Sequence, residues 1–442
     1  MKDKFEIKDK SVIKGKTWSE TGQSEASGKS EAGAGTSAQQ RRGAFWNMMG
    51  SGMMSVNTVV LSMLVSNFFD LDEVGRFTLA LTTAQILYSL ALFGANDRQM
   101  LDYGHRYHFA DYFWVKVSST ILAAIVCVIT SAAMGSGAAA RNYTYLLTAF
   151  MLVNSFAELY QAMYFQNNRL DLSGKSLFYR YLSSTVAFLV VILAGGTVVA
   201  ACVWMLAVDI AVTLFWVLRY EKTFRDSGYV LQREPVKLLT REVFPLYLSV
   251  LGSLLIINCP KYLINYYLSD DIQGAYSILF MPTYVINLLG QFIFKPYYAR
   301  YSQVLLEEKK GFRRLFSVHA AAVAVFALVC GFGMWLLGVP LLRIFFGQDL
   351  SAYRGMMFLF VLSGGLLAIN QLLYYIMVII SRQKMILVNY LIGLTIAVLV
   401  GFAAVPRLGI AGAWLAFTVG QMLLLAGYLL ILLGFFRWGK SV

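Results

Sequence analysis

Twelve apolar segments, each long enough to cross a bilayer, follow one another along the sequence from Phe45 onward. A stretch of about 20 apolar residues spans the hydrocarbon core of a membrane as a helix. A helix satisfies its backbone polar groups internally, as lipid requires. The sequence therefore predicts an all-α polytopic membrane protein. The expected spans are 45–68, 76–95, 112–134, 143–166, 177–195, 197–218, 243–267, 275–298, 315–338, 355–380, 384–405 and 409–434.

The charge content excludes a soluble globule. Only 14% of the 442 residues are charged and 58% are hydrophobic, whereas a soluble domain carries about 25% charged residues. A chain with so few charges lacks the polar surface that would cover a water-exposed core. This composition agrees with the succession of membrane spans.

The basic residues predict the orientation in the membrane, because cytoplasmic loops retain Lys and Arg. With the N-terminus placed inside, 31 of the 37 basic residues fall on the cytoplasmic side and Lys261 falls within a span. The outer side carries Arg76, Arg141, Arg343, Arg354 and Arg407. We therefore predict a multi-pass protein of the cytoplasmic (inner) membrane with both termini in the cytoplasm. The net charge of +13 follows from this topology, so no nucleic-acid partner is expected.

The polar stretches divide the chain into parts. Residues 1–42 are mostly Lys, Glu, Ser, Gly and Ala, a composition that buries too little apolar surface to order itself. We expect a disordered cytoplasmic tail there, the alternative being a regulatory or partner-binding arm. The remaining parts are expected to be an N-terminal six-helix bundle at 43–218, a cytoplasmic linker at 219–242, a C-terminal six-helix bundle at 243–436 and a cytoplasmic tail at 437–442.

Two short echoes indicate that the bundles are related by internal repetition. Asp72–Phe77 and Asp271–Tyr276 both carry an acidic residue, a glycine three positions later and then an aromatic residue, and they lie 199 residues apart. Gly196–Ala200 resembles Gly409–Ala413 at an offset of 213. The extra residues fall in 339–354, which we expect to form an interfacial loop or half-helix. Paired six-helix halves are typical of transporters that bind substrate at the interface between the repeats.

Polar residues form stripes on one face of equivalent spans in the two halves. In the first span the polar positions recur at steps of three and four, which places them on one helical face. Polar side chains at membrane depth face protein or water, so the stripes predict a central hydrated cavity. The alternative is that small polar residues serve only to pack helices together. The predicted lining residues are Asn47, Ser51, Ser55, Thr58, Gln85, Asn258, Asn265, Asn287 and Gln291.

Five charged residues at or near membrane depth are candidates for function. Lys261 follows Pro260 within the seventh span; its alternative is to extend its long side chain to the outer surface. Lys295 and Arg98 lie near the cytoplasmic ends of two striped spans, where ordinary flanking charges also occur. Glu158 and Asp209 are the deep carboxylates. They are candidates for coupling to protons or sodium, the alternative being structural ion pairing.

No pattern predicts a catalytic centre, a metal site or a cofactor. The sequence has no GxxxxGK[ST] phosphate-binding loop, and its three histidines do not form an HExxH pattern. The cysteines fall in apolar stretches without the close spacing of a metal or redox pair, and we interpret them as small buried residues. They are Cys127, Cys202, Cys259 and Cys330. The chain is therefore expected to be a transporter and not an enzyme.

Four parts of the sequence carry a likeness to a known family: the opening Phe45–Ser51, the loop Asp72–Phe77, the fourth span and its exit at Glu158–Gln166 and Arg169–Ser176, and the run Gly409–Trp414. Together they resemble the oligosaccharide flippase (Wzx-like) branch of the multidrug/oligosaccharidyl-lipid/polysaccharide exporter superfamily. The likeness covers about residues 43–435.

This resemblance implies two six-helix bundles arranged as a V around a cationic cavity. It also implies alternating access that moves polyprenyl-diphosphate-linked sugars from the inner to the outer leaflet for surface polysaccharide synthesis. The expected partners are the lipid-linked glycan, membrane lipids and glycan polymerase or assembly proteins. Lys261, Lys295 and Arg98 would then attract the anionic diphosphate. One departure is that the first span is neutral beyond Arg42, whereas some relatives place an arginine deeper there.

Two other functions make different demands on the sequence. A cation-coupled multidrug exporter of the same superfamily would need carboxylates facing the cavity. A membrane glycan polymerase or ligase would need a large outer loop, because such sites are usually built on loops.

Overall fold

The structure is a computed structural model that describes residues 29–102, 106–133, 137–226, 228–294, 297, 301, 304, 309–380 and 382–438. Each of the twelve predicted spans corresponds to one long helix, which confirms the predicted all-α class. The long helices are α1 (Lys29–Phe68), α2 (Leu71–Leu92), α4 (Phe109–Ala133), α5 (Ala138–Gln166), α6 (Leu170–Leu193), α7 (Val198–Phe224), α8 (Arg233–Tyr267), α9 (Asp270–Phe294), α11 (Lys309–Phe346), α12 (Arg354–Ile379), α13 (Gln383–Leu408) and α14 (Ile410–Trp438). The short elements are α3 (Ala95–Leu101) and the 3₁₀ turn η2 (Ser351–Tyr353).

Nine of the described helices are long and apolar enough to cross a membrane, judged by length and composition. The other three long helices are α2, α5 and α9, and in α2 and α5 polar residues such as Gln85 and Glu158 interrupt the apolar sequence. Both helices pack against several neighbours, so these polar side chains can face protein. The chain is a multi-pass membrane protein.

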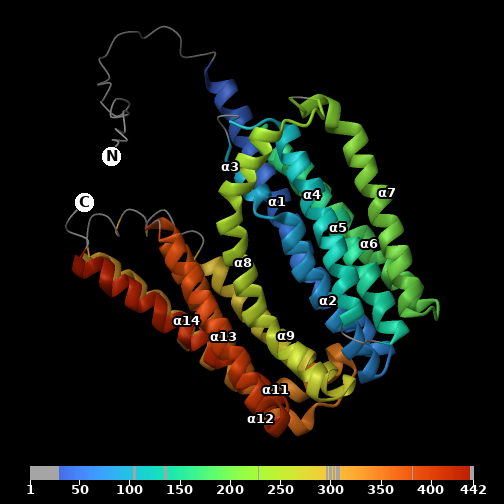
Figure 1. The fold of residues 1–442 in the computed structure, drawn as a ribbon, viewed down its shortest axis with the longest axis vertical. Coiled ribbons are helices and arrows are strands. Elements are labelled where there is room, and N and C mark those ends of the chain that lie inside the picture. The colour runs from blue at the N-terminus through green and yellow to red at the C-terminus, as the bar shows by residue number, and fades with distance from the viewer. Residues whose placement is uncertain are drawn as a thin grey trace, which may run out of the picture.

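The helices form two bundles, α1–α7 and α8–α14, that meet at one end and diverge towards the other (Figure 1). We call the end where α1 passes into α2 the apex. The opposite end is where α1 begins and α14 ends. Helix α8 is shared between the bundles. Its first half packs Val243 and Tyr247 against Phe93 and Phe109 of the first bundle, whereas its second half packs against α13 and α14.

The two bundles touch at the apex through a reciprocal contact of α2 with α9. A Cβ atom added to Gly75 would lie 1.9 Å from the carbonyl oxygen of Asp270, and one added to Gly274 would lie 2.4 Å from that of Leu71. Gly75 and Gly274 are equivalent in the predicted repeat, and so are Leu71 and Asp270. One helical turn deeper, the equivalent residues Thr78 and Ser277 share a hydrogen bond of 3.0 Å between hydroxyl oxygens. The repeat predicted from the sequence is therefore a pseudo-twofold relation whose axis passes between these two helices.

A second set of contacts holds the apex together between α1 and the end of α11. Ser66 Oγ donates to the carbonyl oxygen of Phe346 at 2.5 Å, and Asn67 Nδ2 donates to that of Phe345 at 2.6 Å. Gln348 Nε2 donates back to the carbonyl oxygen of Ser66 at 2.9 Å. These bonds join the first bundle to the second through backbone carbonyls at a helix end, which lack partners within their own helix.

Three predicted boundaries differ from the structure. Helix α1 begins at Lys29, so it extends into the predicted disordered tail, of which residues 1–28 lie outside the described residues. The predicted linker 219–242 is largely helical, because α7 continues to Phe224 and α8 starts at Arg233. The first half of 339–354 continues α11 through Pro340, and the loop starts only at Gly347, which has a left-handed φ of 67°. Hydropathy marks the membrane-embedded part of a helix and not its polar extensions.

Candidate functional site

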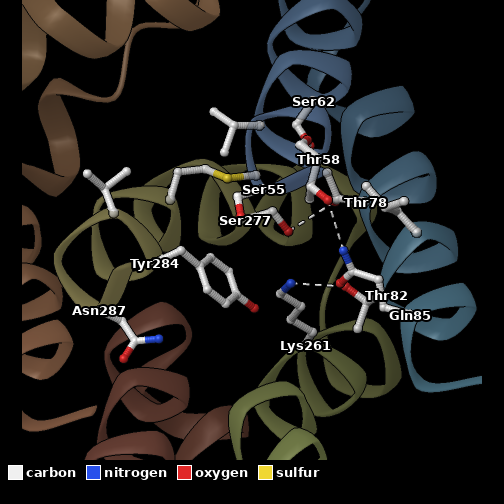
Figure 2. A pocket seen from close by; sticks show the side chains of 14 residues that line it. Ser55, Thr58, Ser62, Thr78, Thr82, Gln85, Lys261, Ser277, Tyr284 and Asn287 are labelled. Atoms are coloured by element: carbon white, nitrogen blue, oxygen red, sulfur yellow. Dashed lines mark hydrogen bonds between the residues drawn. The ribbon is translucent and has the colours of Figure 1, made fainter. Parts of the chain in front are cut away.

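A polar cavity of about 240 Å³ lies between the two bundles and adjoins the α2–α9 contact (Figure 2). Four helices contribute to it: α1, α2, α8 and α9. The lining residues are Ser55, Thr58, Val59, Ser62, Thr78, Leu81, Thr82, Gln85, Lys261, Ser277, Met281, Tyr284, Val285 and Asn287. The striped helices of both halves thus face one shared cavity, as their spacing predicts.

Lys261 is the one charged residue among the described residues that line the cavity. It is 6% exposed, and its Nζ donates to Thr82 Oγ1 at 2.9 Å. The ammonium also lies 5.8 Å from the ring centroid of Tyr284 and 6.0 Å from that of Phe280, within range of a cation–π attraction. Figure 2 shows the side chain directed into the cavity from α8. Lys261 therefore does not extend to the membrane surface, which was the alternative considered from the sequence.

This ammonium lacks a protein counter-ion within the part of the chain that the structure describes, where no carboxylate forms an ion pair with it. A charge removed from water is costly unless it is paired and hydrogen-bonded. One hydroxyl and two ring faces compensate it only in part. The site is therefore suited to an anionic ligand that completes the pairing.

Other polar groups of the cavity form hydrogen bonds between neighbouring helices. Gln85 Nε2 donates to Thr58 Oγ1 at 3.1 Å, which joins α2 to α1 (Figure 2). The carbonyl oxygen of the Asn287 side chain is buried and accepts no hydrogen bond from the described residues. A buried polar atom without a partner is uncommon, so Asn287 is available to a ligand that carries hydroxyl groups.

The structure brings together part of the predicted lining and leaves the rest elsewhere. Ser55, Thr58, Gln85 and Asn287 line the cavity with Lys261. Asn47 and Ser51 continue the same face of α1 but lie farther from the apex and do not line it.

The two predicted asparagines of α8 are engaged locally. Asn258 Nδ2 donates to the carbonyl oxygen of Leu254 at 3.0 Å, and Asn265 Nδ2 donates to Asp270 Oδ1 at 3.4 Å. The side chain of Gln291 and the whole of Lys295 lie outside the described residues.

Arg98 lies on the short helix α3 and does not line the cavity. Its Nη2 is 3.6 Å from Glu242 Oε2, and Arg106 Nη2 lies 2.9 Å from the other oxygen of the same carboxylate. Glu242 belongs to the first half of α8, which crosses to this bundle. In this structure Arg98 therefore helps to tie α8 to the first bundle, and it is not beside Lys261.

The two deep carboxylates lie inside the first bundle, and each has a cationic neighbour. Glu158 accepts hydrogen bonds from Tyr88 Oη and from Asn96 Nδ2, the latter at 2.9 Å, and interacts electrostatically with Lys116. The Lys116 amine is fully buried and donates to Ser155 Oγ at 3.1 Å and to the carbonyl oxygen of Ala91 at 3.2 Å.

Asp209 is paired with Arg180 in a second buried cluster. Arg180 Nε lies 3.4 Å from Asp209 Oδ1, with both side chains almost fully buried. Asn154 bridges them, accepting from Arg180 at 2.7 Å and donating to Asp209 at 3.1 Å. For Asp209 the structural pairing considered from the sequence is what the structure shows.

The count of basic residues did not single out Lys116 and Arg180, because it included both among the cytoplasmic residues although they lie within the predicted spans 112–134 and 177–195. The structure places them inside α4 and α6, each well past the first turn of an apolar helix. The carboxylates Glu158 and Asp209 in nearby spans could have indicated these two residues, since a buried carboxylate is destabilising without a nearby cation.

Replacing Asp209 by Asn should destabilise the protein by about 3–5 kcal/mol, because it leaves Arg180 buried without its counter-ion. The measurement is thermal unfolding in detergent. The double variant Arg180→Met with Asp209→Leu should recover most of the loss, since packed apolar residues can replace a buried ion pair. Equal stability of Asp209→Asn and the wild-type protein would contradict a structural role for the pair.

Three comparisons place the chain among known proteins. The family model described as "Polysaccharide biosynthesis protein" matches residues 41–302, more than half of the chain. No curated protein matches the sequence. A structure of the lipid II flippase MurJ in an inward closed conformation is similar, with a TM-score of 0.64 and 13% identity over 88% of this chain and 87% of that one.

Two transporters of the MOP superfamily share the fold as well. An inward-facing multidrug resistance MATE family transporter has a TM-score of 0.62 and 13% identity, over 88% of this chain and 96% of that chain. A MOP superfamily transporter from Pyrococcus furiosus, described as having a binding pocket of reversed polarity, has a TM-score of 0.55 and 16% identity. It covers 90% of this chain and 96% of its own.

Proposed function

Because this chain belongs to the polysaccharide biosynthesis protein family, we propose that it flips polyprenyl-diphosphate-linked oligosaccharides across the cytoplasmic membrane for surface polysaccharide synthesis. The family and the fold make it a transporter or flippase of the MOP superfamily, which confirms the resemblance found in the sequence. The proposal adds the substrate class, the membrane and the residue that binds the charged group.

The buried ammonium of Lys261 carries this proposal. A diphosphate diester has two negative charges and acceptor oxygens for a charge-assisted hydrogen bond. Held next to Lys261, it would supply the counter-ion that the described carboxylates do not. Electrostatic attraction inside a cavity is stronger than in bulk water, so the bound lipid would be anchored by its most polar part.

The size of the cavity fits a head group and not a whole glycan. Its volume of 240 Å³ is below the roughly 300–1,000 Å³ of typical small-molecule sites. The diphosphate would occupy it together with the nearest part of the first sugar, whose hydroxyls can reach Asn287. The rest of the oligosaccharide would extend between the diverging bundles. With the orientation predicted from the basic residues, these open towards the cytoplasm and the apex is the closed outer end.

The two alternative functions fit the cavity less well. A cation exporter needs an unpaired carboxylate facing its substrate, whereas the carboxylates Glu158 and Asp209 lie within the first bundle, away from the described lining. A glycan polymerase or ligase would need a large outer loop. The connection between α11 and α12, which contains η2, is only residues 347–353.

Lys261→Ala should reduce the initial rate of flipping at least tenfold, because a hydrogen bond to a charged group contributes about 1.5–3 kcal/mol. The assay uses purified protein in liposomes with a fluorescent polyprenyl-diphosphate sugar and follows its accessibility in each leaflet. Lys261→Arg should retain part of the rate by keeping the charge. Lys237→Ala, which removes an exposed lysine from the same helix, is the matched control. Wild-type flipping by Lys261→Ala at equal protein content would rule out the proposed site.

Glu158 is our proposed coupling residue, since Asp209 is ion-paired with Arg180 whereas Glu158, on α5, is only partly buried and accepts hydrogen bonds from Tyr88 and Asn96. If a proton gradient accelerates flipping in the wild-type protein, Glu158→Gln should remove that acceleration and leave gradient-independent flipping. The same assay with and without a pH gradient measures both. Undiminished acceleration in Glu158→Gln would exclude this role.

A further inference from the structure

An apolar groove of about 520 Å³ adjoins the polar cavity. It lies between α1, α9 and α11, with Val361 of α12 at its floor. Every residue that lines it is apolar, glycine, proline or cysteine. Its volume is more than twice that of the polar cavity. Binding of a charged head group beside Lys261 does not require this groove.

Small residues on α11 create the space. Gly333 and Cys330 line the groove opposite Pro282 of α9. A Cβ atom added to Gly333 would meet no atom within 4 Å, so the room is not filled by a neighbouring helix. A longer side chain at this position would occupy the groove without displacing backbone.

The groove is open on the side that faces lipid. Its rim includes Leu337, Phe345 and Val285, which are 58%, 49% and 45% exposed. Its floor includes Val361 and Ile286, which are buried. An apolar, lipid-exposed concavity in a membrane helix bundle matches hydrocarbon and excludes a polar ligand.

The groove and the polar cavity share a wall. Val59, Met281 and Val285 line both, and Val59 and Val285 directly follow the polar residues Thr58 and Tyr284 in the sequence. A molecule with a charged head and a hydrocarbon chain can therefore place its head beside Lys261 and its chain in the groove. An ordinary phospholipid keeps its head group at the membrane surface, so it would not use the inner end of the groove.

We infer that this groove binds the polyprenyl chain of the substrate at the point where the chain leaves the diphosphate. The inference rests on the proposed function and extends it from the head group to the lipid. It makes the site bipartite: Lys261 holds the anion, and α1, α9 and α11 hold the first isoprene units on the membrane side. Discrimination between lipid carriers would then depend on the groove and not on the cavity.

The test compares Gly333→Trp, which fills the groove, with Gly355→Trp. Gly355 also has open space around it but lies outside the groove, at the start of α12. Each protein in liposomes is given the same fluorescent sugar diphosphate on a long polyprenyl chain and on an ethyl group, which is a short chain without any isoprene unit. We expect Gly333→Trp to lower the ratio of long-chain to short-chain flipping rates about fivefold or more, and Gly355→Trp to keep the wild-type ratio. Using a ratio removes differences in folding and reconstitution.

A photo-crosslinking measurement supports or overturns the same inference without transport. A long-chain sugar diphosphate with a diazirine on its first isoprene should label groove residues such as Met281 and Met334, and this labelling should disappear in Gly333→Trp. An unchanged rate ratio, or labelling of the groove only by a diazirine phospholipid, would show that bulk lipid occupies it. If the wild-type protein binds and flips neither substrate, the proposed function fails and the inference falls with it.

Discussion

The close backbone approach of α2 and α9 is the contact on which the arrangement of the two bundles depends. In lipid, apolar surfaces gain little by leaving their surroundings, so helices associate through tight packing of small residues and through hydrogen bonds. Gly75 and Gly274 provide the packing, and Thr78 and Ser277 provide the bond. Because the contact is reciprocal about a pseudo-twofold axis, either glycine enlarged by a single methyl group would force the same interface apart.

This contact also positions the polar cavity that adjoins it. The polar faces of α1, α2 and α9 converge next to the α2–α9 contact, and together with Lys261 of α8 they enclose the cavity. The ammonium is kept from the membrane surface by Thr82 and the ring of Tyr284, and its charge is left for a ligand to neutralise. On the membrane side the cavity passes into an apolar groove. The polar cavity, the apolar groove and the α2–α9 contact thus lie side by side, an arrangement that suits the alternating access proposed for an amphiphilic substrate.

The sequence predicts the helices, the repeat and the cavity-facing stripes well, because hydropathy and helical periodicity are local properties. It predicts Lys261 because a lysine inside an apolar span is conspicuous. It misplaces Arg98, whose partner Glu242 depends on α8 crossing to the first bundle, a tertiary fact without a local signal. Lys116 and Arg180 are missed for a similar reason: their role follows from which helices are neighbours. The repeat offset could not show that Thr78 and Ser277 touch, since the position of the symmetry axis is set by packing.

We propose that the α2–α9 contact at the apex is the outer gate and that it opens during transport. The most direct measurement is a reversible cross-link between Thr78→Cys and Ser277→Cys, whose native hydroxyls lie 3.0 Å apart, in a protein with its native cysteines replaced by alanine. We predict that oxidation stops flipping in liposomes, that reduction restores it, and that neither single-cysteine variant responds. Continued flipping by protein shown to be fully cross-linked would contradict this account of the gate.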